Sequence, residues 1–209
     1  MTTNGTTTSE RQVKLFNSFM DLEVFRFGEF YLKSGQMTPI YIDLRRLISR
    51  PTVLRQAAED MVKVIKEKDL KFDYIIGVPY AAIPLATLVS SILDVPMLMR
   101  RKEAKSHGTK QMVEGIYETG RRVLLVEDVV THGDSIRETA EGLNEDGLEV
   151  IDSISILDRQ QGGGEMLQKH GINYHSLLTM EIILDCLVEK NQITAERKTE
   201  IIEHLRKPF

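Results

Sequence analysis

The sequence predicts an α/β fold in which a twisted sheet with a parallel centre is flanked by helices. Short apolar runs alternate with segments of helical periodicity along the chain, which is the pattern of this fold class. The run VLLV at 123–126 is apolar at every position, as is typical of a strand buried on both faces of a parallel sheet. Just beyond it, Ile136, Ala140 and Leu143 recur at helical spacing. The 209 residues are enough for one such domain with small appendages.

The elements expected before this strand alternate between helix and strand. Pro51 is suited to the first position of a helix, because its missing N–H group costs nothing there. In chain order we expect a helix over Val13–Leu22, weak alternation over Phe25–Tyr31, a turn over Lys33–Pro39, a strand over Ile40–Leu44, a helix over Pro51–Ile65, a strand over Tyr74–Val78, a helix over Leu85–Leu93 and a strand over Val95–Met99.

The elements expected later in the chain continue the alternation. Two strands, over Met112–Tyr117 and Arg121–Glu127, are predicted to form a hairpin over the sheet edge. Gly147 is expected to end the helix that follows the VLLV strand, and Thr194 to cap a helix near the carboxyl terminus. The remaining expected elements are a strand over Val150–Leu157, a helix reaching His170, a strand over Ile172–Leu178 and two amphipathic helices within Glu181–Phe209.

Composition excludes several function classes. The net charge of −4 argues against a nucleic-acid binder that works through bulk positive charge. Cys186 is the only cysteine, so an internal disulfide is excluded and a reducing compartment fits. No apolar run approaches the roughly 20 residues of a membrane span, and the polar, Thr-rich start does not resemble a secretory signal. We therefore expect a cytoplasmic protein that binds neither membrane nor nucleic acid.

Two carboxylates and a loop of small and hydroxyl residues end the VLLV strand. Glu127 and Asp128 come first, and the loop Thr131–Ser135 then opens a helix. Loop amides and the positive end of a helix dipole suit a phosphate, and paired carboxylates can accept hydrogen bonds from ribose hydroxyls. This order predicts a sugar-phosphate site. The alternative is an ordinary strand–helix unit, but a buried strand does not by itself call for two adjacent acids there.

The segment VLLVEDVVTHGDS resembles the phosphoribosyl-pyrophosphate (PRPP) motif of type I phosphoribosyltransferases. One residue departs from that pattern. Asp134 stands where the family usually has a small neutral residue beside the expected 5′-phosphate. Like charges at that place would weaken binding unless the aspartate points to water.

Three other segments resemble orotate phosphoribosyltransferases: FYLKSGQMTPIYIDLR, RRKEAKSHG and LDRQQGG. Without the resemblance, Lys33 would be a solvated turn residue, the basic run 100–110 a solvated loop and Arg159 a surface residue. An arginine at a strand end can, however, bind a carboxylate bidentately. Ala81 stands where many bacterial members carry a lysine. In this respect the chain resembles the eukaryotic branch, which has a small residue at this position. The resemblance covers roughly residues 11 to 190.

The resemblance implies roles for individual residues. Those implied to be catalytic are Lys105, His107 and Asp128. Those implied to bind PRPP are Lys33, Tyr80, Arg101, Lys102, Lys105, His107, Glu127, Asp128, Val129, Val130, Thr131, His132, Gly133, Asp134 and Ser135. Those implied to frame orotate are Lys33, Tyr41, Ile42, Thr131 and Arg159. Mg²⁺ is the implied cofactor, held mainly by the ligand, so no protein residue is assigned to the metal.

As a member of this family, the chain would transfer the phosphoribosyl group of PRPP to orotate in de novo pyrimidine (UMP) biosynthesis. The fold would be of the type I phosphoribosyltransferase class, with a small hood subdomain. A homodimer with shared active sites is implied, and so is an orotidine monophosphate decarboxylase, fused or docked, because the tail resembles the linker start of eukaryotic UMP synthases. We divide the chain into a disordered tail (1–10), the transferase domain (11–190) and a C-terminal helix (191–209) compatible with the start of a linker.

Two alternatives stay open. One is a type I transferase that acts on a purine base, against which the three orotate-type segments argue. The other is a regulatory protein that binds PRPP without turnover, and such a protein would not need Lys105 and His107.

Overall fold

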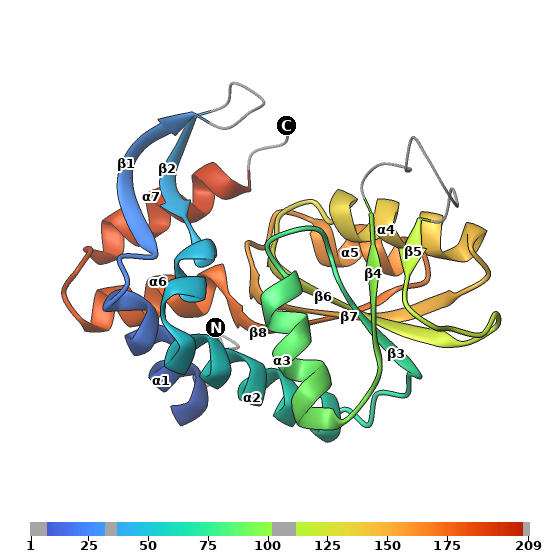
Figure 1. Cartoon of the computed structure of the whole chain (residues 1–209). Helices are drawn as coiled ribbons and strands as arrows, with labels where there is room; N and C mark the ends of the chain where they lie inside the picture. Colours follow the sequence, from blue (N-terminus) through green and yellow to red (C-terminus); the bar gives the residue numbers. More distant parts are fainter. Residues whose placement is uncertain (1–7, 32–36, 102–111, 207–209) are drawn as a thin grey trace.

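A six-stranded sheet forms the centre of the computed structural model, which describes residues 8–31, 37–101 and 112–206 (Figure 1). Its strand order is β5-β4-β3-β6-β7-β8. The strands are β3 (Tyr74–Gly77), β4 (Met97–Arg100), β5 (Val113–Glu114), β6 (Arg122–Val130), β7 (Glu149–Asp158) and β8 (Asn173–Thr179). All neighbouring pairs are parallel except β4 and β5, which are antiparallel. The prediction of a sheet with a parallel centre is thus confirmed.

A separate hairpin stands beside this sheet. It pairs β1 (Phe25–Tyr31) with β2 (Met37–Ile42), and the register shifts between Phe27 and Phe30. The helix nearest the carboxyl terminus, α7 (Ala195–Leu205), packs on β2, and the His204 Nε2 atom lies 2.8 Å from the Met37 carbonyl oxygen. Segments from both ends of the chain thus build one small unit (Figure 1), which confirms the predicted hood.

Helices cover both faces of the sheet (Figure 1). The helices of the described residues are α1 (Glu10–Met20), α2 (Pro51–Glu67), α3 (Ile83–Leu93), α4 (Asp134–Glu145), α5 (Gly163–Lys169), α6 (Met180–Glu189) and α7, which packs on the hairpin, with a 3-10 helix η1 (Leu44–Ser49) before α2. Local sequence explains several of their starts. Ser9 forms a capping box with Gln12, and the Thr194 hydroxyl accepts a hydrogen bond from Arg197 N–H, as predicted. None of the helices in the described ranges is long and apolar enough to cross a membrane.

Strand β6 is buried on both faces, as its apolar run predicts. Leu124 and Val126 belong to the larger core, on the side of α2, while Val123 and Leu125 belong to a second core on the side of α4. All four side chains are at most 1% exposed. Burial of each contributes roughly 1.5–3 kcal/mol relative to exposure. The strand that carries the two carboxylates is therefore firmly held in the middle of the sheet.

The predicted hairpin over the sheet edge is wrong. Strand β5 is antiparallel to β4, whereas β6 lies between β3 and β7. The reason is the burial of β6, because a strand that is apolar on both faces needs neighbours and helices on both sides. The predicted turn over Lys33–Pro39 also extends too far, since Thr38 and Pro39 already lie in β2.

Candidate active site

The carboxyl ends of the parallel strands bring two of the predicted segments together. Val130 at the end of β6 pairs in register with Asp158 at the end of β7. The Arg159 N–H group donates to the Val130 carbonyl oxygen over 2.9 Å. The loop after β6 and the loop after β7 therefore start side by side, at the edge where ligands bind in open α/β sheets.

Two glycines let these loops pack backbone against backbone. Gly133, the N-cap of α4, has a left-handed φ of 86°. A Cβ on Gly133 would lie 2.8 Å from Met166 Cε, and one on Gly163 would lie 2.8 Å from the Thr131 carbonyl oxygen. Gly133 also has no side chain to cap α4, so the first N–H groups of this twelve-residue helix are without an acceptor from the N-cap side chain. Such a helix start suits a phosphate.

The two carboxylates of the predicted ribose site differ in environment. Glu127 is 9% exposed, whereas Asp128 is half-buried and its Oδ1 atom accepts a hydrogen bond from Val129 N–H at 2.8 Å. Burial, reinforced by Asp158 and Glu127 nearby, raises the pKa of Tyr174. Both acids lie within the carboxyl-terminal half of β6, as the sequence places them.

Asp134 is solvated and lies beside a cation. Its side chain is 64% exposed, and Oδ1 lies 3.6 Å from Nη2 of Arg137. Arg137 also holds Glu141, at 2.8 Å. A carboxylate that is solvated and placed beside a cation repels a neighbouring phosphate only weakly. The departure from the family pattern at this position therefore leaves the loop able to accept an anion.

Arg159 is a buried cation without a carboxylate partner in the described part of the chain. The residue is 6% exposed, its Nε atom has no hydrogen-bond partner there, and Nη2 donates to Thr38 Oγ1 over a long 3.4 Å. Burial lowers the pKa of the guanidinium, and no nearby acid opposes this effect. A buried charge without compensation is costly. This side chain is thus prepared to receive an anion.

Thr38 is a site residue that the sequence reasoning missed. It is 2% exposed, and its hydroxyl donates to the Ile40 carbonyl oxygen at 3.0 Å while accepting from Arg159. The hydroxyl therefore helps to orient the guanidinium. The sequence signal for this role is a hydroxyl residue directly before Pro39 in the segment that resembles the family, although the sequence alone predicts a turn there.

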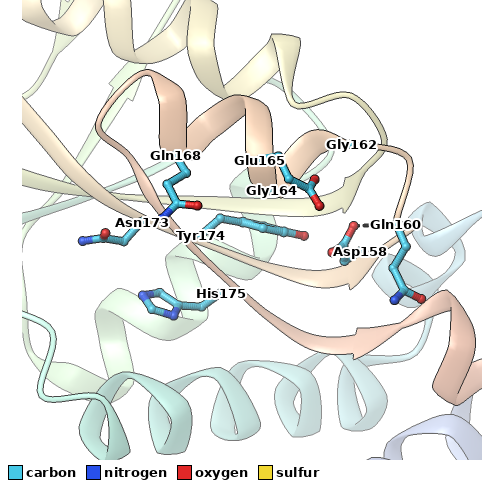
Figure 2. Close-up of a pocket in the computed structure, with 9 residues that line it drawn as sticks. All are labelled: Asp158, Gln160, Gly162, Gly164, Glu165, Gln168, Asn173, Tyr174 and His175. Atoms are coloured by element: carbon cyan, nitrogen blue, oxygen red, sulfur yellow. Dashed lines mark hydrogen bonds between the residues drawn. The ribbon is translucent and has the colours of Figure 1, made fainter. Parts of the chain in front are cut away.

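Two hollows lie near the carboxyl end of β7, and the charges that line them differ. A small cavity of about 40 Å³ lies between Arg159 and helices α6 and α7. A larger hollow of about 530 Å³ lies along α5 and β8 (Figure 2). Its lining residues are Asp158, Gln160, Gly162, Gly164, Glu165, Gln168, Asn173, Tyr174 and His175. Figure 2 shows the Tyr174 ring pointing toward Asp158 and Glu165. Because these carboxylates repel anions, the larger hollow is the poorer place for an anionic substrate.

The hood contributes two predicted base-binding residues from β2. The Tyr41 hydroxyl accepts a hydrogen bond from Arg45 Nη2 at 2.9 Å, and its ring lies 5.5 Å from that of Phe30. Ile42 packs partly against the larger core. These contacts hold the hood hairpin in shape, so Tyr41 and Ile42 have fixed positions on the strand that also carries Thr38.

Arg101 and Tyr80 follow two other strands of the same sheet edge. Arg101 N–H donates to the Met112 carbonyl oxygen at 2.8 Å, and its Nε donates to Glu114 Oε1 at 2.7 Å. Tyr80 is 65% exposed, and the Pro79–Tyr80 peptide bond is cis. Both side chains are accessible to a ligand, in contrast to the buried Arg159.

The remaining predicted residues divide into two groups. Val130 is buried and Val129, Thr131 and His132 are half-buried, while Ser135 is exposed at the start of α4. The predicted residues Lys33, Lys102, Lys105 and His107 lie outside the described residues. The structure therefore brings together the loop Thr131–Ser135 (the predicted phosphate loop), the two carboxylates, Arg159 and the hood strand.

Known proteins resemble this chain over most of its length. The model of the phosphoribosyl transferase domain matches residues 46–192. An orotate phosphoribosyltransferase of Caenorhabditis elegans is 61% identical over 199 residues, which cover 95% of this chain and 88% of that protein.

Two solved structures share the fold. The UMP synthase of Leishmania donovani superposes with a TM-score of 0.83 at 36% identity, over 93% of this chain and 42% of that one. The orotate phosphoribosyltransferase of Aeropyrum pernix superposes with a TM-score of 0.74 at 32% identity, over 83% and 97%. The chain thus spans nearly all of the latter protein but about two-fifths of the UMP synthase.

Proposed function

Because the chain belongs to the orotate phosphoribosyltransferases, we propose that it works through the site described above. It is a transferase that moves the 5-phosphoribosyl group of PRPP to orotate, giving orotidine 5′-monophosphate and pyrophosphate. This reaction belongs to the biosynthesis of pyrimidine nucleotides.

The buried guanidinium of Arg159 is the observation that carries the proposed site. It is 6% exposed and has no acidic partner among residues 8–31, 37–101 and 112–206. Orotate carries a carboxylate, which can accept a bidentate pair of hydrogen bonds from a guanidinium. A hydrogen bond to a charged group contributes about 1.5–3 kcal/mol, and here it would also compensate a buried charge. Orotate binding thus completes an ion pair that the protein leaves open.

The proposed position of PRPP follows from the loop after β6. Its 5′-phosphate would lie on the loop Thr131–Ser135 at the start of α4, where backbone N–H groups and the helix dipole favour an anion. Glu127 and Asp128 would accept hydrogen bonds from the ribose hydroxyls. The base would lie between Arg159 and the hood, framed by Lys33, Tyr41, Ile42 and Thr131.

The proposed chemistry needs no nucleophile from the protein. A ring nitrogen of the anionic orotate forms a bond to C1′ of the ribose and releases its proton to solvent, and the bond from C1′ to pyrophosphate breaks with its electron pair leaving on the oxygen. Negative charge therefore gathers on the pyrophosphate. Arg101, Lys102, Lys105 and His107 would stabilise that charge in the transition state.

Mg²⁺ is the proposed cofactor. Carboxylate oxygens are the donors that this ion prefers, so Glu127 and Asp128 fit it, and substrate oxygens would supply most of its ligands. When bound, the ion would neutralise part of the pyrophosphate charge. Activity should vanish when EDTA removes divalent ions and should return when Mg²⁺ is added in excess. Full activity in EDTA would contradict the proposed requirement for Mg²⁺.

A homodimer with shared sites is also proposed. Exposed apolar side chains occur on or just after three neighbouring strands: Tyr80 after β3, Met99 in β4 and Ile116 after β5 are 65%, 48% and 95% exposed. Lys105→Ala and Asp128→Asn should each be nearly inactive. When the two variants are unfolded, mixed and refolded together, random pairing makes half of the dimers mixed, and one of the two sites in each mixed C2 dimer is intact. Activity should therefore return to about a quarter of the wild-type value. No recovery on mixing would show that both groups serve the same subunit's site.

A decarboxylase partner, fused or docked, and a cytoplasmic location complete the proposal. The likeness to UMP synthase and the single buried cysteine support them. Cell fractionation and co-purification of orotidine monophosphate decarboxylase activity test both points, and recovery of the protein with membranes would contradict the second.

Turnover itself is tested by the loss of orotate absorbance in the presence of PRPP and Mg²⁺. The chain should consume orotate and release pyrophosphate, while adenine, guanine and hypoxanthine should not react. PRPP binding without turnover would indicate a regulatory protein instead, and turnover of a purine base would indicate the other transferase class.

A further inference from the structure

Resting on the proposed function and going beyond it, we propose that Arg100 is a positioning residue for PRPP binding. Its guanidinium occupies a notch in helix α4 at Gly142. The contact fixes the end of β4, and with it the backbone of Arg101, against the helix whose start carries the phosphate loop.

The notch is defined by the distances around Gly142. A Cβ atom at this position would lie 1.9 Å from Arg100 Nη2, 2.5 Å from Cζ and 2.7 Å from Nε. Real Cβ atoms essentially never come closer than 3.0 Å to a heavy atom outside their own residue and its chain neighbours. Three atoms of the planar guanidinium thus fill the space where any other residue would place its side chain. Glycine is the residue that allows Arg100 to lie directly on the helix.

Glycine is an unusual choice for this part of α4. Position 142 is inside the helix, which spans Asp134–Glu145, and glycine is among the least favourable residues in a helix interior. Alanine would stabilise the isolated helix, but its methyl group would collide with Arg100. Gly142 is therefore unfavourable for the helix itself, but it leaves the space that the Arg100 guanidinium occupies.

The strand directs Arg100 toward this helix. Leu98 belongs to the core on the α4 side of the sheet, and Arg100, two residues later on the same strand, points to the same face. The Arg100 Nε atom is buried without a hydrogen-bond partner among the described residues. Gly142 lies in the last turn of α4, where the helix dipole favours a cation. The contact is thus one of packing and dipole attraction.

The contact links strand β4 to helix α4, which follows strand β6, although β4 and β6 are not neighbours in the sheet. Strand β3 separates β4 from β6, the strand that leads into α4. Arg100 spans this gap, because its backbone belongs to β4 and its guanidinium lies on α4. PRPP carries phosphate groups at both ends, which the proposed site assigns to Arg101 and to Thr131–Ser135. The contact of Arg100 with Gly142 restrains the Arg101 backbone. This holds whether Arg101 acts in the site of its own subunit or in that of the partner in the proposed dimer.

A double-mutant cycle of Arg100→Ala and Gly142→Ala tests the notch by thermal unfolding and by steady-state kinetics. Gly142→Ala should lower Tm by a few degrees in the wild-type background, because the methyl group displaces Arg100, but should raise Tm by about 2 °C when Arg100 is already alanine. Each single variant should lower kcat/KM for PRPP about 10-fold with the KM for orotate within 2-fold. The double variant should be no worse than either single variant, because both remove the same contact.

Two further variants separate the notch from simpler explanations. Asn144→Ala changes an exposed residue of the same helix, and it should leave the PRPP kinetics unchanged. Arg100→Lys keeps the charge but not the planar group, so it should recover less than half of the lost kcat/KM. Full recovery by lysine, or effects of the two alanine variants that multiply, would overturn the proposal. If the wild type turns over no orotate, the proposed function fails, whereas the opposite Tm shifts of Gly142→Ala would still stand.

Discussion

Arg159 and Arg101 stand at the ends of two strands of one sheet, and their charges are balanced in different ways. Arg159, after β7, is 6% exposed and has no acidic partner in the described part of the chain. Arg101, after β4, has a side chain that is 40% exposed, and it pairs with Glu114 at 2.7 Å. In the proposed site, the first would be held in place before the substrate arrives, while the second would exchange one anion for another.

This difference assigns the two ends of the site different tasks. A fixed, dry guanidinium is costly to maintain but selects its anion strongly, because the site already excludes water. A solvated arginine with a carboxylate partner gains less from each new contact, since water and Glu114 compete for it. Recognition of the orotate carboxylate should therefore depend on one residue, Arg159, and pyrophosphate recognition on several cations that act together.

The largest effect is expected from Arg159→Ala. Loss of a charge-assisted pair should cost about 2–3 kcal/mol, so the KM for orotate should rise roughly 30–150-fold. The KM for PRPP should change far less, because the phosphate loop is untouched. Steady-state kinetics with each substrate varied in turn measures both. Equal changes in the two KM values would count against the role of Arg159.

A strong but different effect is expected from Lys105→Ala, at a residue that lies outside the described ranges. Its charge is expected to act mostly when the pyrophosphate leaves, which is a transition-state interaction. The kcat should fall at least about 10-fold, equivalent to about 1.4 kcal/mol, while PRPP binding stays closer to normal. Rapid-quench kinetics with an independent measurement of PRPP affinity separates the two. Wild-type kcat in the variant would show that the basic segment is only solvated.

A smaller effect is expected from Glu114→Gln, which removes the charge that competes for Arg101. Both side chains are more than a third exposed, so the pair contributes only about 0–1 kcal/mol. The KM for PRPP should fall by up to about 5-fold, and the change should shrink at high salt. The same assay at two ionic strengths checks this. A raised KM would show instead that Glu114 holds Arg101 in its working position.

The smallest effect is expected from Asp134→Ser. The carboxylate is 64% exposed and lies beside Arg137, so its removal should change the KM for PRPP by less than about 2-fold. Titration calorimetry with PRPP gives the same comparison without turnover. A large gain in affinity would show that Asp134 faces the 5′-phosphate when the ligand is bound.

The sequence allowed much of this site to be predicted, for physical reasons. The run at 123–126 is apolar at every position, so its strand had to be central, and the acids and the glycine loop after it had to lie at the sheet edge. The contacts of Arg159 with Thr38 and of Arg100 with Gly142 join segments far apart in the chain. The spacing of apolar residues along the chain predicts helices and strands, but it does not predict contacts between distant segments. The wrong hairpin has the same origin, because short strands do not reveal their partners.

The most direct test of the central claim compares the affinities of orotidine 5′-monophosphate and uridine 5′-monophosphate for the wild type and for Arg159→Ala. The two nucleotides differ only in the carboxylate, so their ratio isolates the contact proposed for Arg159. The wild type should prefer orotidine 5′-monophosphate by roughly 30–150-fold. In Arg159→Ala this preference should shrink to a few-fold, with the affinity for uridine 5′-monophosphate nearly unchanged. The same preference in both proteins would contradict the account.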